Sequence, residues 1–285
     1  MDKIDVAFIG GSGLYKVPNF KKYKWIKIKS NFGGPSPEIC VGKLNKSNIA
    51  FLPRHGKNHN ISPTKINYRA NIEALKIIGS ECIVSLSAVG SLREDYKPGH
   101  FVLVDQFLDQ TYLRNKTFFD DDLVVHVPFA SPVCSKLKKS LSDSLRKLKV
   151  KFHSSGTYIC IEGPQFSSLA ESQLFRSWGC DVIGMTNMPE AKLALEAGIC
   201  YASVAMVTDF DCWHPDHESV TVEQIVETLN KNSKKAFCLI DEICKHKKFF
   251  CDQKTKNLSR DSLITNLSYV KNSTKKKLSN ILGKL

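Results

Sequence analysis

Short apolar runs that alternate with helix-like segments are the feature of this 285-residue chain that most restricts its fold. The strand-like runs are residues 6–10, 48–52, 81–91, 101–107, 157–166, 181–187 and 199–211. Apolar side chains at helical spacing occur between them, in residues 64–79, 133–150, 189–198 and 219–247. This alternation predicts an α/β fold in which helices flank a mixed or largely parallel central sheet.

A single domain is expected to span residues 1–285. No Gly/Ser/Pro-rich linker divides the chain, and no internal repeat is found. A chain of this length can bury one large core. The segment from about residue 246 is polar and basic, and we expect it to be an appendage of the same domain.

Positive charge is concentrated in two parts of the chain, which has 41 Lys/Arg against 28 Asp/Glu. Residues 245–285 carry 11 Lys/Arg against 2 Asp/Glu, and residues 16–29 carry six lysines. Such blocks can bind nucleic acid, but these lack interleaved stacking platforms and any nucleic-acid motif. A solvated lysine-rich surface is therefore the better interpretation, and a nucleic-acid-binding protein remains a distant alternative.

Several features predict a cytoplasmic protein, with the nucleus as an alternative location. No run of about 18 apolar residues is present, so no membrane span is predicted. Asp2 and Asp5 lie where a signal peptide would be basic, so we expect no targeting segment. The ten cysteines, scattered from Cys40 to Cys251 without a C-x-x-C pair, favour reduced thiols over disulfides or a structural metal.

Three loops that follow predicted strands suggest a site for a small oxyanion. They are Gly10-Gly-Ser-Gly13, Pro53-Arg-His-Gly56 and Ser85-Leu-Ser-Ala-Val-Gly-Ser91. Glycines let backbone N–H groups approach an anion, and arginine offers a planar fork that matches phosphate. Taken singly, each loop could be an ordinary turn or surface ion pair. Together they favour one shared anion, and we assign Ser12, Arg54 and His55 to it.

Three further segments could line the rest of such a site. Phe166, in Glu162-Gly-Pro-Gln-Phe-Ser167, could stack on a planar ring, or it could be a core aromatic. The backbone of residues 182–186 could line a sugar. Asp209 and Asp211 end an apolar run two residues apart, and in an extended chain such residues share a face. Both carboxylates are then expected to point into one space, although aspartate also begins ordinary turns.

The motifs together resemble the trimeric purine nucleoside phosphorylase family. They are GGSG, PRHG with His59 following, SAVGSL, EGPQF, GMTNMPE and TDFD, in this order, between Asp5 and Lys245. The resemblance is greatest to the branch that acts on 5′-methylthioadenosine. It implies cleavage of the N-glycosidic bond with inorganic phosphate as co-substrate, no cofactor or metal, no membrane partner, and a homotrimer.

Roles for individual residues follow from the same resemblance. The catalytic residues would be Asp209 and His55. The phosphate-binding residues would be Ser12, Arg54, His55, Ser87, Ala88 and Thr186. The nucleoside-binding residues would be Phe166, Ser167, Ile183, Met185, Asp209, Asp211, Val222, Ile225 and His126. His126 would come from a neighbouring subunit, and Leu263 and Leu267 are candidates for a cap over a neighbour's 5′ pocket.

The two aspartates predict the choice of base. A protonated Asp209 could donate a hydrogen bond to purine N7, and an ionised Asp211 could accept from a 6-amino group. Gly184 instead favours a 6-oxopurine substrate, because the methylthioadenosine branch usually has asparagine there and the 6-oxopurine branch has glycine. An adenosine or 6-oxopurine nucleoside phosphorylase therefore stays open as an alternative function.

Overall fold

The computed structural model describes residues 3–11, 14, 20–36, 38–215, 222–245, 249, 251 and 253–283; at residues 21, 222–225 and 253 it describes the backbone alone. Within these residues, eleven strands form one mixed sheet. Its main path runs β2 (Lys21–Ile26), β3 (Ile39–Leu44), β4 (Ser47–Pro53), β1 (Val6–Gly10), β5 (Cys82–Ser91), β10 (Val182–Gly184), β9 (Thr157–Ile161) and β7 (Gln106–Gln110). A branch from β5 runs through β11 (Cys200–Asp209), β6 (Phe101–Val104) and β8 (Phe152–His153).

Parallel pairing at the centre of the sheet confirms the predicted α/β fold class. Strand β1 is parallel to both β4 and β5, and β11 is parallel to β5. Residues Val6–Gly10 are buried throughout, as expected of a parallel strand covered on both faces. The antiparallel strands β2 and β3 were not predicted, because KKYKWI in β2 has too few apolar residues to stand out.

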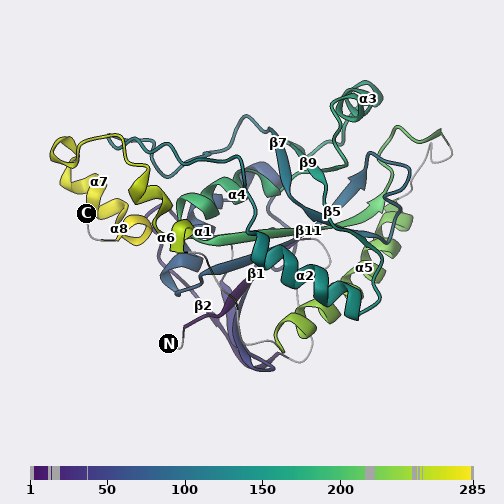
Figure 1. Cartoon of the computed structure of the whole chain (residues 1–285), viewed down its shortest axis with the longest axis horizontal. Helices are drawn as coiled ribbons and strands as arrows, with labels where there is room; N and C mark the ends of the chain where they lie inside the picture. The colour runs from purple at the N-terminus through teal and green to yellow at the C-terminus, as the bar shows by residue number, and fades with distance from the viewer. Residues whose placement is uncertain are drawn as a thin grey trace.

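The helices of the described chain lie on both faces of the sheet, as Figure 1 shows. They are α1 (Tyr68–Ile77), α2 (Ser135–Lys147), α3 (Leu169–Ser177), α4 (Asn187–Glu196), α5 (Val222–Ile243), α6 (Gln253–Asp261), α7 (Asn272–Lys277) and α8 (Ser279–Leu282), with the 3₁₀ helices η1 (Pro63–Lys65) and η3 (Leu267–Tyr269). All four predicted helices are present with shifted ends. Helix α3, which begins at a capping box between Ser168 and Glu171, was not predicted.

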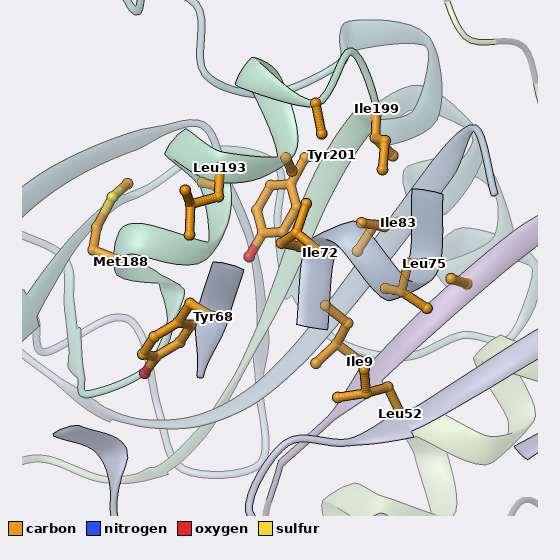
Figure 2. Close-up of a cluster of buried hydrophobic side chains, with 14 of the residues drawn as sticks. Ile9, Leu52, Tyr68, Ile72, Leu75, Ile83, Met188, Leu193, Ile199 and Tyr201 are labelled. Atoms are coloured by element: carbon orange, nitrogen blue, oxygen red, sulfur yellow. The ribbon is translucent and has the colours of Figure 1, made fainter. Parts of the chain in front are cut away.

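Alternate residues of the central strands pack into two apolar layers. In β1, Ala7 and Ile9 face the layer that contains α1 and α4, whereas Val6 and Phe8 face the layer of α2 and α5. Figure 2 shows part of the first layer, with Ile9 and Leu52 from the sheet, Ile72 and Leu75 from α1, and Leu193 from α4. Both faces of the central strands are therefore covered, and their ends are the part of the sheet that remains open to form a site.

The C-terminal segment packs on the outside of the first layer, at the yellow end of the chain in Figure 1. The Ser259 hydroxyl donates to the Glu196 carbonyl at 2.6 Å, and the Asn280 amide donates to the Glu73 carboxylate at 3.0 Å. The segment is therefore attached to α1 and α4 by polar contacts as well as by apolar packing. Among the described helices, none is long and apolar enough to cross a membrane.

Candidate active site

A cavity of about 550 Å³ opens where β4, β5 and β11 end and where the loops after β9 and β10 begin. Most of the residues that the sequence assigned to a site lie around it. They are Arg54, His55, Ser87, Ala88, Phe166, Ser167, Ile183, Met185, Thr186, Asp209 and Asp211. The strand ends thus bring residues from distant parts of the chain to one place, as is general for α/β sheets.

Four other predicted residues are not placed in this cavity. Ser12 lies outside the described residues, and so do the side chains of Val222 and Ile225, in the first turn of α5. Leu229, further along α5, does line the cavity. His126 is exposed and is not among the lining residues.

His126 lies beside the C-terminal segment. Its backbone N–H donates to the Ser262 carbonyl at 3.1 Å, and Val125 forms a β-bridge with Leu263. Leu263 and Leu267 pack against the first apolar layer as partly buried side chains. Leu263, one of the two predicted cap residues, and His126 are therefore neighbours within one chain.

Arg54 is completely buried at the base of the cavity, and its charge is already paired. Its Nε donates to Glu190 Oε2 at 2.8 Å, and its Nη2 donates to Glu190 Oε1 at 2.9 Å and to Ser85 Oγ at 2.7 Å. A buried guanidinium needs such a partner, because its desolvation is otherwise costly. Glu190 thus engages Nε and Nη2. Nη1 makes a long hydrogen bond of 3.5 Å to the Leu86 carbonyl, and its second N–H is the group that can reach an anion.

His55 has one ring nitrogen fixed by the backbone. Its Nδ1 lies 2.8 Å from the Ile61 carbonyl, and since a carbonyl only accepts, Nδ1 carries the proton. Burial and the nearby Arg54 charge lower the pKa of the imidazole to about 4. At neutral pH the ring is therefore uncharged, and Nε2 is an acceptor. At the anion site predicted from the sequence, His55 would therefore accept a hydrogen bond from a protonated anion.

Two hydroxyls complete this side of the cavity. Ser87 Oγ and Thr186 Oγ1 are 3.1 Å apart and both belong to buried residues. Ser87 comes from β5, and Thr186 is the residue before α4. Hydroxyls that can rotate to donate, beside Arg54 Nη1 and an imidazole acceptor, suit a partly protonated oxyanion such as phosphate.

The two aspartates line the same cavity but by a different geometry from the one predicted. The pairing of β11 with β5 is shifted between Val207 and Asp209, and β11 ends at Asp209. Asp211 follows in a turn with φ of 52°, in the left-handed region. The extended i, i+2 relation was therefore wrong, because the chain turns after the strand. A hydrogen bond of 3.0 Å from the Asp211 N–H to Asp209 Oδ2 holds the turn and keeps the residues together.

Their carboxyls have different surroundings. Burial raises the pKa of Asp209, against the opposing effect of a 2.6 Å hydrogen bond from the Thr208 hydroxyl. Asp211 instead accepts from the Ser167 hydroxyl at 2.8 Å. A carboxyl whose protonated form is favoured by burial, beside a second carboxyl, is an arrangement able to donate to one ring atom and accept from another.

Arg114 and Glu162 form a buried support behind the cavity that sequence reasoning did not assign. Arg114 Nε donates to Glu162 Oε1 at 3.0 Å, and Nη1 donates to the Met185 carbonyl at 2.7 Å. Burial raises the pKa of Glu162, but hydrogen bonds led by the one from Thr64 lower it to about 2. The Arg114–Glu162 pair therefore holds the backbone of the two cavity-lining loops that contain Glu162 and Met185. Arg114 lies in a segment without a regular pattern, so no sequence signal marked it.

The described residues form an α/β protein whose strand ends surround a cavity lined by groups that suit an oxyanion and by a pair of carboxyls in different surroundings. The model of the phosphorylase superfamily matches residues 5–245, and the chain belongs to this family. The resemblance predicted from the motifs is thereby confirmed.

Individual relatives are similar over nearly the whole chain. An S-methyl-5′-thioadenosine phosphorylase of Koribacter versatilis is 47% identical over 280 residues, which is 98% of this chain and 96% of the relative. A crystal structure of a methylthioadenosine phosphorylase from an antarctic soil metagenomic library is 41% identical with a TM-score of 0.92, covering 99% of this chain and all of the other. A methylthioadenosine phosphorylase of Schistosoma mansoni in complex with adenine is 35% identical with a TM-score of 0.84, covering 91% and 99%.

Proposed function

We propose that the protein cleaves 5′-methylthioadenosine with inorganic phosphate, giving adenine and 5-methylthioribose 1-phosphate. The observation that carries this proposal is the position of Asp209, whose pKa burial raises, in the same cavity as His55, Ser87 and Thr186. The names of the similar proteins support the substrate. The products belong to purine and methionine salvage.

Breaking the bond between C1′ and N9 leaves positive charge on the sugar and negative charge on the purine. In its protonated form, which burial favours, Asp209 donates to N7 and stabilises the departing base. Phosphate attacks C1′ and forms the new C–O bond as the C–N bond breaks. Its negative charge also stabilises the cationic sugar in the transition state.

Phosphate is held by cavity-lining side chains other than Asp209. The hydroxyls of Ser87 and Thr186 and Nη1 of Arg54 donate to its oxygens, and neutral His55 accepts from its remaining P–OH at Nε2. Bound in this way, the nucleophile is positioned before the reaction starts. Phosphate is the only co-substrate in this scheme, which needs no electron transfer.

Selection of an aminopurine is assigned to Asp211. Ser167 donates to its carboxylate, which stays an acceptor and can receive the 6-amino group of adenine. A 6-oxo group would place an acceptor against an acceptor. Phe166, whose side chain is 76% exposed at the cavity, is assigned to stacking on the ring.

A homotrimer is proposed because His126 lies on the surface, away from the cavity of its own chain. It would enter a neighbour's 5′ pocket together with Leu263, which is held beside it. Sedimentation velocity tests the assembly, and a monomer at assay concentration would refute it.

A cytoplasmic location is proposed because all ten cysteines are free thiols.

The reaction is tested by supplying methylthioadenosine, adenosine and inosine in turn, with and without phosphate, and by measuring the free base. Phosphate-dependent release of adenine, fastest from methylthioadenosine, is the expected result. Faster release of hypoxanthine from inosine would refute the assignment of Asp211, and no release from any nucleoside would refute the reaction.

A further inference from the structure

Gly184, the last residue of β10, has no room for any side chain. A Cβ atom built on it would lie 2.0 Å from Tyr158 Oη and 2.7 Å from Tyr158 Cζ, both far inside van der Waals contact. The two residues belong to neighbouring parallel strands, β10 and β9. The backbone of Gly184 is not in the left-handed region that favours glycine. The glycine is therefore required by the tyrosine ring and not by its own conformation.

Tyr158 uses this space to bring its hydroxyl to the back of the proposed phosphate pocket. The residue is fully buried, and its Oη lies 3.4 Å from Ser87 Oγ and 3.5 Å from the backbone N–H of Thr186, which donates to it. Ser87 and Thr186 line the cavity, whereas Tyr158 lies behind them. Burial raises the pKa of the phenol to about 12, so it keeps its proton and can donate to Ser87.

We propose that Gly184 and Tyr158 act as one unit that orients Ser87 and Thr186 toward phosphate, with Tyr158 as a positioning residue. This proposal rests on the proposed function, because the oriented hydroxyls are taken to bind the phosphate co-substrate. The proposal also gives a different reason for the presence of glycine at position 184. The glycine at this position is explained by Tyr158, and the choice between a 6-amino and a 6-oxo base is assigned to Asp211.

A double-mutant cycle of thermal stability tests whether Gly184 and Tyr158 pack as one unit, and it needs no activity assay. Gly184→Asn forces a side chain into the tyrosine ring and should lower Tm by many degrees. Tyr158→Leu removes the ring and opens that space, so the double variant should melt several degrees above Gly184→Asn alone. If the double variant is instead as unstable as the sum of the two single losses, the residues are not one unit and the proposal is overturned.

Tyr158→Phe tests the positioning half, because it removes the hydroxyl and keeps the ring. We expect the KM for phosphate to rise about five- to tenfold, the loss of one hydrogen bond, with kcat and the nucleoside KM changed less than about twofold. The adenosine-to-inosine preference should not change. Tyr96→Phe is the matched control, since its phenol donates to the Ser155 carbonyl and it is not among the residues that line the cavity.

The same two variants can be compared without turnover by adding inorganic phosphate and measuring how far it raises the Tm of each. A weaker phosphate response in Tyr158→Phe than in Tyr96→Phe supports the proposal. Equal responses, or a change in base preference, overturn it. A wild-type protein that binds phosphate but releases no base would refute the proposed function instead, and the stability cycle would still decide the packing.

Discussion

Arg54 and Glu190 form a bidentate ion pair that is sealed from solvent, with side-chain exposures of 0% and 2%. The two residues are far apart in the sequence, one at the end of β4 and the other in the first turn of α4. The pair therefore ties the sheet to a helix directly beneath the cavity. It also fixes the direction in which Nη1 of Arg54 points.

Breaking this pair from one side should strongly destabilise the protein. Glu190→Gln leaves the Arg54 charge buried without compensation, and we expect a loss of about 3–5 kcal/mol in the free energy of unfolding. Urea unfolding followed by circular dichroism measures it. Asp143→Asn is the control, because it removes an exposed partner of Lys139 and Arg146 and should leave stability unchanged. Equal midpoints for the two variants would contradict this description of the pair.

Asp209→Asn should reduce activity while preserving the fold. The amide cannot supply the proton that N7 receives, so kcat should fall by about 10²- to 10⁴-fold. Burial raises the pKa of Asp209, so folding favours its protonated form, and this contribution to stability is lost as pH rises from the unfolded to the folded pKa. At neutral pH the variant should therefore be at least as stable as the wild type. Unchanged turnover would remove Asp209 from the mechanism.

His55 should make the protein less stable in mild acid. Its folded pKa is about 4, below the ordinary value of 6.5, so between these values the unfolded chain binds the extra proton. Stability from this residue is full above pH 6.5 and is lost as pH falls toward 4, by roughly 3 kcal/mol in total.

The stability of His55→Asn, measured in urea at several pH values, provides the comparison. Its amide can still donate to the Ile61 carbonyl, but it does not titrate. The pKa of His59, whose ring stacks on His55, is also lowered by burial. His59 is present in both proteins, so its contribution to the slope of stability against pH is kept in both. Identical slopes in wild type and variant would show that His55 is not held neutral by the fold.

Asp211→Asn should relax the choice of base. The amide offers both a donor and an acceptor, so a 6-oxo group no longer meets an acceptor alone. We expect the ratio of kcat/KM for adenosine over inosine to fall by about tenfold or more. Ser167→Ala removes only the hydrogen bond to Asp211 and should cause a smaller change in the same direction. A ratio that both substitutions leave intact would assign base selection elsewhere.

The parts of the site that could be predicted are those with a local cause. Parallel strands place their carboxyl ends at one edge, so polar loops after apolar runs indicated Arg54, His55 and Asp209 without a structure. Ser87 and Thr186 were assigned through the resemblance to a known family. The order of the strands in the sheet could not be obtained in this way. It depends on which apolar runs pack against each other. Residues 21–26 have too weak an apolar pattern to be recognised as a strand, and the short apolar run at residues 39–44 was not predicted as one.

The supporting residues could not be predicted because their partners are distant in sequence. Glu190 looked like one polar position in a helix, and it is buried only because Arg54 meets it. Tyr158 looked like one more apolar strand residue, and its effect appears only when β9 lies beside β10. Asp211 was assigned to the site for a wrong local reason, since a turn and not an extended strand brings it there.

The central claim is that phosphate itself is the nucleophile that attacks C1′. The most direct measurement supplies 5′-methylthioadenosine with ¹⁸O-labelled phosphate and determines the mass of the sugar product. The account predicts a sugar 1-phosphate that retains all of the labelled oxygens, formed in equal amount with adenine. Adenine released together with an unphosphorylated sugar, or at the same rate without phosphate, would mean that water is the nucleophile and would contradict the account.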